Sequence, residues 1–307
     1  MQSPIPYSAL IDRPPLRWPD NARVAFWVQV NLESFEFDRP GIALAPTRAD
    51  QPIPDVNNAG WRDYGVRVGV WRMMEVLDRY DLRSSTPTNS DVCLHFPEII
   101  REAQKRHWEF MGHAITNSHI LTGLPEDRER EVIRTSLEAL TTATGQRPRG
   151  WLGPGLAQTF RTNDLLAEAG LDYVSDWCND DQPYPIEVRS GRLIGVPYCK
   201  DIGDIPVFVG AGQPAERWYQ MLCDQFDVLY DEGARSGRIY GLAIHPFISG
   251  VPFRSKWLDK ALAYITGHDR VWITTAAEIA DWYYRHYYDE ALAAVRQRRA
   301  RAAGGRA

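Results

Sequence analysis

Four short apolar stretches of the chain each lead into a side chain that can take part in acid–base chemistry. Residues 23–31 lead to Glu33, two positions further on, and residues 109–112, 171–175 and 239–244 are followed directly by His113, Asp176 and His245. Near-continuous apolar runs of this length are typical of buried strands in a parallel sheet. In a barrel of parallel strands, catalytic groups gather at the C-terminal ends of the strands. The pattern therefore predicts an active site built from these strand ends.

Segments with helical spacing separate these strands. We expect helices at residues 68–81, 97–105, 126–144, 162–169, 214–232 and 255–265, and a last one opened by the capping box Thr275–Glu278. Shorter apolar runs at residues 149–152 and 270–273 are further strand candidates. Alternating strands and helices call for a parallel sheet, so the fold class expected is α/β, as a barrel in a single domain.

Composition divides the chain into three expected parts. Residues 1–22 carry prolines that keep them out of a helix, so they read as an extended arm. Residues 23–290 hold the barrel. Residues 291–307 are basic and low in complexity, so we expect a frayed tail.

The charge and hydropathy patterns exclude several function classes. The 307 residues carry a net charge of −5, which gives no support for binding nucleic acid. No apolar run is long enough for a membrane span, and the N-terminus does not resemble a secretory signal, so we expect a cytoplasmic protein. The four cysteines form no close pair and are expected to be free thiols. Aromatic residues between 282 and 288 could cover a subunit interface, which favours a homo-oligomer.

Glu33 and the two histidines at strand ends are the candidate catalytic residues. Glu33 is either part of a solvated acidic loop or a general base, because a partly buried carboxylate can take a proton from water. His113 is either a core histidine or a group that binds water, substrate or metal. His245, followed by Pro246, is a candidate general acid for a leaving nitrogen.

Other residues near these strand ends could bind substrate. Asp176 and Asp180 either cap a turn or form a polar wall. Trp151 precedes a loop with Gly153 and Gly155, where backbone N–H groups could approach a carbonyl oxygen. The sequence contains no GxSxG, HExxH or Walker-type GxxxxGK[ST] motif, so serine-esterase, zincin and P-loop chemistry are not indicated.

Between residues 18 and 284 the chain resembles the polysaccharide deacetylase (NodB-homology) family, in particular its branch of allantoinases and cyclic imide hydrolases. The most specific segments are residues 30–33 (VNLE), 109–113 (EFMGH), 147–151 (RPRGW), 173–176 (YVSD), 179–181 (NDD), 196–198 (VPY) and 268–272 (HDRVW). The resemblance implies a distorted (β/α) barrel. It also implies that His245 matches the late catalytic histidine of the family.

The resemblance changes the expected metal chemistry. The family's paired aspartates, one a base and one a metal ligand, match Glu33 and Ser34. Its two metal-binding histidines match His113 and Asn117, so two of three ligand positions differ. His119 could replace the lost ligand, which would give a divalent metal such as zinc at His113, His119 and Glu33.

These observations predict a hydrolase that opens a C–N bond in a small cyclic amide, imide or ureide without a required cofactor. Glu33 would be the base, His113 would position water or polarise the carbonyl, and His245 would be the acid. The pocket would be shaped by Asn117, Trp151, Gly153, Gly155, Asp176 and Asp180. A metal-dependent deacetylase of an N-acetylated sugar or acyl amide is the first alternative, and a catalytically inactive barrel used for binding is the second.

Overall fold

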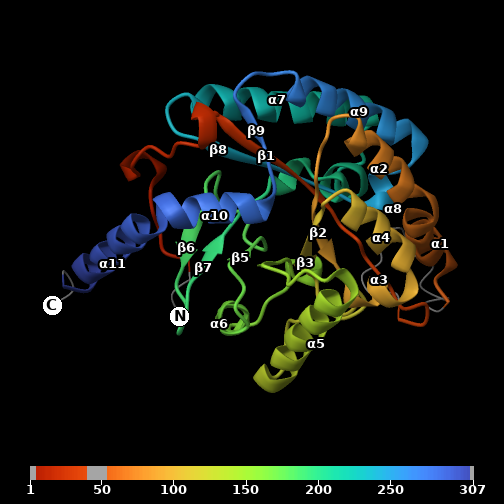
Figure 1. Cartoon of the computed structure of the whole chain (residues 1–307), viewed down its shortest axis with the longest axis horizontal. Coiled ribbons are helices and arrows are strands. Elements are labelled where there is room, and N and C mark those ends of the chain that lie inside the picture. The colour runs from red at the N-terminus through yellow and green to blue at the C-terminus, as the bar shows by residue number, and fades with distance from the viewer. Residues whose placement is uncertain (1–4, 40–53, 305–307) are drawn as a thin grey trace.

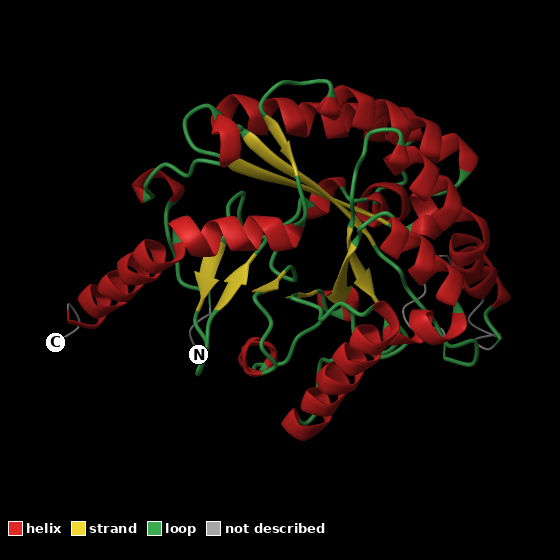
Figure 2. Ribbon diagram, viewed as in Figure 1, coloured by secondary structure: helices red, strands yellow, loops and turns green. Residues whose placement is uncertain are grey.

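The computed structural model describes residues 5–39 and 54–304, with side chains described as far as residue 298. The strands are β1 (Val24–Val30), β2 (Ser85–Thr88), β3 (Glu109–Gly112), β4 (Gly150–Trp151), β5 (Tyr173–Val174), β6 (Tyr184–Ile186), β7 (Leu193–Gly195), β8 (Arg238–Ile244) and β9 (Val271–Ile273). Figure 2 shows them at the centre of the molecule with helices around them.

The helices follow the strands along the chain and cover them from outside (Figure 1). They are α1 (Val56–Tyr64), α2 (Val70–Asp78), α3 (Ser90–His95), α4 (Pro97–Lys105), α5 (Glu126–Thr144), α6 (Thr162–Glu168), α7 (Ala215–Gly233), α8 (Pro246–Ser249), α9 (Pro252–Thr266), α10 (Ala276–His286) and α11 (Tyr288–Gly304). Among the described residues, none of these helices combines the length and apolar content that crossing a bilayer requires.

The strands form an irregular parallel barrel. One sheet has the order β8-β1-β9, and the second has the order β2-β3-β4-β5-β7-β6, with only β6 antiparallel. Bridges from Val28 to Ser84 and from Leu32 to Thr88 join β1 to β2. On the far side, the Cys199 amide donates to the Gly241 carbonyl of β8 at 2.9 Å. The expected α/β class and distorted barrel are confirmed.

Alternation along β1 determines what faces the interior of the barrel. Even-numbered residues from Val24 to Leu32 pack in the apolar layer shared with helices α2, α7 and α9. Ala25 and Trp27 point the other way, into the apolar core enclosed by the strands. Because side chains alternate between the two faces of a strand, the polar residues Gln29, Asn31 and Glu33 lie on the same inner face as Ala25 and Trp27.

Several predicted elements are present at or near their expected bounds. The strand at residues 109–112 and the helix at 126–144 coincide with β3 and α5. Strand β2 was not expected, because its sequence, Ser-Thr-Pro-Thr, lacks apolar residues. Its hydroxyl groups all have partners: Ser85 Oγ donates to Glu109 Oε2 at 2.7 Å, and the hydroxyls of Thr86 and Thr88 donate to backbone carbonyls, so the polar strand is buried without unpaired hydroxyl groups.

The terminal segments pack on each other. In the arm expected at residues 1–22, Leu16 and Trp18 are buried. Most of the segment for which the sequence predicts a frayed tail is helical, as α11. There Val295 is buried and Arg298 pairs with Asp12 at 2.9 Å, which anchors the helix to the arm. Residues 1–4 and 305–307 of these parts lie outside the described residues.

Candidate active site

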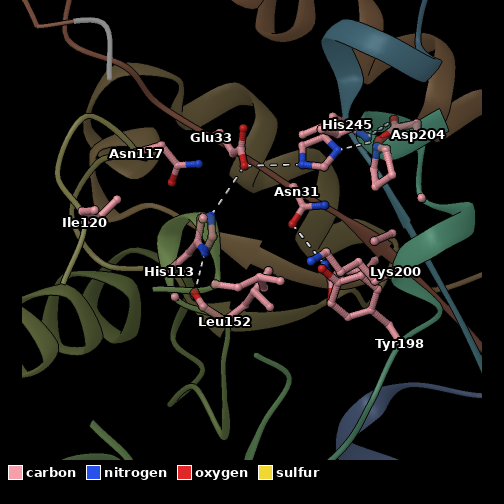
Figure 3. Close-up of a pocket in the computed structure, with 18 of the residues that line it drawn as sticks. Asn31, Glu33, His113, Asn117, Ile120, Leu152, Tyr198, Lys200, Asp204 and His245 are labelled. Atoms are coloured by element: carbon pink, nitrogen blue, oxygen red, sulfur yellow. Dashed lines mark hydrogen bonds and ion pairs between the residues drawn. The ribbon is translucent and has the colours of Figure 1, made fainter. Parts of the chain in front are cut away.

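A cavity of about 270 Å³ opens at the C-terminal ends of the barrel strands. The structure brings Glu33, His113 and His245 together in its wall, from the ends of β1, β3 and β8. Figure 3 shows the Glu33 carboxylate between the two imidazoles. Residues from three distant parts of the sequence therefore meet at one point.

Glu33 is held by both histidines. Its Oε1 lies 3.5 Å from His245 Nε2 and 3.6 Å from His113 Nε2; the His113 side chain is buried, and those of Glu33 and His245 are 9% and 12% exposed. Burial raises the pKa of the Glu33 carboxyl, but electrostatic attraction to His245 and, less strongly, to His113 outweighs it and holds the pKa well below its ordinary value. Glu33 is therefore an ionised carboxylate at neutral pH.

His245 is oriented from behind by Asp204, a residue that the sequence analysis missed. Asp204 Oδ1 accepts from His245 Nδ1 at 2.7 Å, and Oδ2 accepts from the His245 amide at 2.6 Å and from Ser249 Oγ at 2.7 Å. Burial lowers the pKa of His245, yet Asp204 and Glu33 outweigh it and raise the pKa to about 10. His245 is therefore an imidazolium whose Nε2–H faces Glu33.

His113 is fixed by a backbone carbonyl. Its Nδ1 hydrogen-bonds the Leu152 carbonyl, which can only accept, so Nδ1 carries a proton and Nε2 is the nitrogen turned toward Glu33 (Figure 3). That Nε2 is buried and has no hydrogen-bond partner within the described part of the chain. It faces the Glu33 carboxylate in the wall of the cavity.

A chain of hydrogen bonds fixes which end of the Asn117 amide faces the cavity. The Ser34 amide donates to Asn89 Oδ1 at 2.8 Å, so Asn89 must present Nδ2 to its other neighbours. Asn89 Nδ2 donates to Asn117 Oδ1 at 3.0 Å. Asn117 lines the cavity, and Figure 3 shows its nitrogen toward Glu33. Asn117 Nδ2 is therefore a hydrogen-bond donor that faces the cavity.

Asp176 acts on the loop after β4 from outside the cavity lining. Its Oδ1 accepts from the Gly153 amide and its Oδ2 from Gln158 Nε2, both at 2.6 Å. Burial raises the pKa of Asp176 to about 6, against these hydrogen bonds. Gly153 and Gly155 line the cavity, with Gly155 at φ 62°, but the Gly153 amide is already committed to Asp176.

Three residues expected at the site are placed elsewhere. Trp151 is fully buried in the core beside β5 and is not part of the cavity lining. Asp180 pairs with Arg13 at 2.6 Å and lines a different hollow. His119 is half exposed, and its Nε2 lies 3.0 Å from Glu36 Oε1, so the structure does not bring it to Glu33 and His113.

The cavity also contains polar residues that the sequence analysis did not single out. Arg62 of α1 is buried, with its guanidinium 3.8 Å from the centre of the Phe35 ring, and it attracts Glu33 electrostatically. Gln29 and Asn31 line the floor. Their signal was present in the sequence: polar residues at every second position of an otherwise apolar strand.

The donor set around Glu33 does not fit the divalent metal that the family resemblance implies. Catalytic zinc sites use three protein ligands. Here His113 Nε2 and Glu33 face each other, but the position of the second metal-binding histidine presents the Asn117 amide nitrogen, which has no lone pair for a cation. Among the described residues, no group of three His, Cys, Asp or Glu side chains is placed to hold a metal ion.

Comparison with known proteins finds similarity to polysaccharide deacetylases in both sequence and fold. The sequence profile described as "Polysaccharide deacetylase" matches residues 62–174. A Schizosaccharomyces pombe protein provisionally named as a polysaccharide deacetylase is 26% identical over 302 residues, covering 88% of this chain and 93% of the relative.

Two solved structures superpose over most of the chain. The crystal structure of a probable polysaccharide deacetylase from Pseudomonas aeruginosa PAO1 gives a TM-score of 0.82 at 27% identity, covering 91% of this chain and 98% of that one. The structure of PuuE allantoinase gives a TM-score of 0.80 at 24% identity, covering 90% and 95%. The second likeness establishes the fold alone.

Fold, cavity and comparisons together define a hydrolase that acts on carbon–nitrogen bonds other than peptide bonds. Residues 62–174 match the polysaccharide deacetylase domain, and the chain is similar over most of its length to proteins named as polysaccharide deacetylases. The residues around Glu33 set it apart from the metal-binding pattern that the sequence resemblance implies for this family.

Proposed function

We propose that the protein hydrolyses the C–N bond of a small cyclic amide, imide or ureide, with Glu33 as base and His245 as acid. The observation that carries this proposal is the Glu33–His245 pair beside Asn117, where a donor amide stands in place of a metal ligand. The cavity of about 270 Å³ is near the lower end of the roughly 300–1,000 Å³ typical of small-molecule sites, which favours a small ring.

The base step begins with water between Glu33 and His113. Glu33 Oε1 accepts a proton from the water while His113 Nε2, fixed through Leu152, helps to orient it. The water oxygen then forms a bond with the carbonyl carbon. Because the resting carboxylate has a depressed pKa, it is a weak base on its own, and the acid step must assist it.

The acid step removes the positive charge of His245, which lowers the pKa of Glu33. His245 Nε2–H donates its proton to the ring nitrogen as the C–N bond breaks, which leaves a neutral imidazole beside Glu33. Loss of that positive charge raises the proton affinity of the carboxylate, so the two transfers favour each other. The proton held on Glu33 then returns to His245, and Asp204 keeps the imidazole in place.

The tetrahedral intermediate carries a negative oxygen that needs hydrogen-bond donors. Asn117 Nδ2 fits this role, because its oxygen is already engaged by Asn89. The Gly153 amide does not, since it donates to Asp176. Arg62, buried in the same wall, adds positive charge.

A metal-dependent deacetylase of an N-acetylated sugar or acyl amide is the second candidate, supported by the names of the related proteins. It requires a metal at a site where the donor set is incomplete. The cytoplasmic location and the homo-oligomer expected from the sequence stay predictions.

A substrate panel separates the two candidates. Purified protein is incubated with succinimide, hydantoin and allantoin, and in parallel with N-acetylglucosamine oligomers, with and without added zinc. We expect ring opening of at least one cyclic compound and no acetate release. Acetate release that depends on zinc would replace the proposal with the deacetylase.

A further inference from the structure

We propose that Gln29 recognises an N–H group on the part of the substrate farthest from the bond that is cleaved. This inference rests on the proposed function, and it adds a specificity-determining residue and a substrate feature to it. Gln29 is 1% exposed and lies in the floor of the cavity whose wall holds Glu33.

The position of Gln29 follows from the alternation of β1. Ala25 and Trp27 on the inner face belong to the apolar core, and Gln29, Asn31 and Glu33 continue that face into the cavity. A polar residue directly above an apolar core marks the depth at which the cavity begins. In the parallel pairing with β8, Gln29 lies opposite Ala243, whose small side chain leaves space above the core.

Hydrogen bonding decides which end of the Gln29 amide is left over. Asn31 Nδ2 donates to the Ile244 carbonyl at 3.1 Å, and that carbonyl can only accept, so Asn31 turns its Oδ1 the other way. Gln29 Nε2 donates to this Oδ1 at 3.2 Å. In this series of hydrogen bonds from Ile244 through Asn31 to Gln29, Gln29 Oε1 is the amide atom that is left without a role.

Gln29 Oε1 is buried and has no hydrogen-bond donor within the part of the chain that the structure describes. A buried acceptor without a donor is unfavourable, so such an atom in a ligand cavity points to a donor on the ligand. An amide, imide or ureide N–H supplies that donor, whereas an ether, ester or alkylated nitrogen does not.

Depth determines which part of the substrate reaches Gln29. Four residues of extended backbone separate Gln29 from Glu33, which corresponds to roughly 13 Å between their Cα atoms. The side chains of Gln29 and Glu33 bridge part of this separation, and a ring whose carbonyl is at Glu33 reaches Gln29 through a substituent on the ring. The geometry favours a substrate with an arm that ends in a carboxamide or ureido group.

A competing explanation for the unpaired oxygen is a structural water. Trp27 Nε1 is also buried without a partner among the described residues, and it lies two positions earlier on the same face of β1. One water could then serve both Trp27 and Gln29. The two explanations differ in whether substitution of Gln29 acts selectively on compounds with the arm.

The experiment compares allantoin, a hydantoin ring with a ureido arm, with hydantoin itself. In Gln29→Met, which removes the amide while keeping a similar volume, the ratio of kcat/KM for allantoin to that for hydantoin should fall roughly tenfold or more. Equal loss on both compounds would overturn the proposal in favour of a structural role. Gln225→Met is the matched control, since Gln225 of α7 lies outside this cavity, and it should leave the ratio unchanged.

Binding measurements keep the inference testable apart from turnover and from folding of the variant. Calorimetry on the wild-type protein should show weaker binding when the arm of allantoin is fully N-methylated. Equal affinity for the methylated and unmethylated compounds would contradict the role of Gln29. If neither ring is opened while the methylation effect is present, the proposed reaction fails and the recognition by Gln29 stands.

Discussion

Glu33 and His245 form a pair of opposite charges in the wall of the cavity, with Oε1 3.5 Å from Nε2. The pair lowers the pKa of the carboxyl and contributes, after Asp204, to raising the pKa of the imidazole to about 10. A carboxylate and an imidazolium are thus held beside one another across the neutral pH range. This is the arrangement that simultaneous proton acceptance from water and proton donation to nitrogen requires.

Replacing Glu33 by glutamine should abolish turnover. The amide preserves the shape of the side chain but cannot accept the proton of water, so kcat should fall about 10³-fold or more. Ring opening is followed by the loss of substrate absorbance, and thermal unfolding serves as the folding control. A folded Glu33→Gln protein with wild-type kcat would remove Glu33 as the base.

Replacing His245 by alanine should slow departure of the leaving nitrogen. The loss should be about 10²–10⁴-fold for a ring whose nitrogen is a poor leaving group, and smaller for an imide, whose nitrogen leaves more easily. The measurement is kcat on hydantoin and succinimide in parallel. An equal loss on both rings would mean that His245 does not act as the acid.

Asp204→Asn should shift the alkaline limb of the pH–rate profile to lower pH. Asp204 raises the pKa of His245, so its removal lets the imidazolium lose its proton earlier, while the amide still supports the ring. The wild-type limb should fall as the pH rises through about 10. An unchanged limb in the variant would show that His245 does not control it.

The raised pKa of His245 also affects the stability of the folded protein. Because the pKa of His245 is raised in the folded state, its contribution to stability is present in full below its unfolded value of about 6.5 and is lost as pH rises through about 10. Thermal unfolding between pH 7 and pH 10.5 should therefore show a larger decrease in Tm for the wild type than for Asp204→Asn. Parallel decreases would contradict the assignment.

Asn117→Ala should lower kcat by about 10²–10³-fold with little change in KM, because an oxyanion donor acts mainly in the transition state. Ser118→Ala is a neighbouring control on the same loop: Ser118 Oγ accepts from the Glu36 amide and does not line the cavity. A KM effect without a kcat effect for Asn117→Ala would assign the residue to substrate binding alone.

The fold was largely predictable from strong local patterns. The apolar run that forms β1 and the acidic start and glycine stop of α5 each identify one element. Strand β2 could not be identified in this way, because its polar residues are buried through pairing with β3 and contacts with β1, and both strands are distant in sequence.

The site was predictable where chemistry followed an apolar strand, as for Glu33, His113 and His245. Asp204 was missed because it precedes a helical turn without a strand before it, and its role exists only through His245. His119 and Asp180 follow strands too, yet they pair with Glu36 and Arg13, so a position near a strand end does not by itself place a side chain in the cavity.

The most direct test of the central claim is ring opening by protein treated with a strong chelator, with bound metal measured in the same sample. The incomplete donor set around Glu33 and Asn117 predicts full activity on the cyclic amide with far less than one metal ion per chain. One tightly bound metal ion per chain, with activity lost on chelation and restored by zinc, would contradict the account.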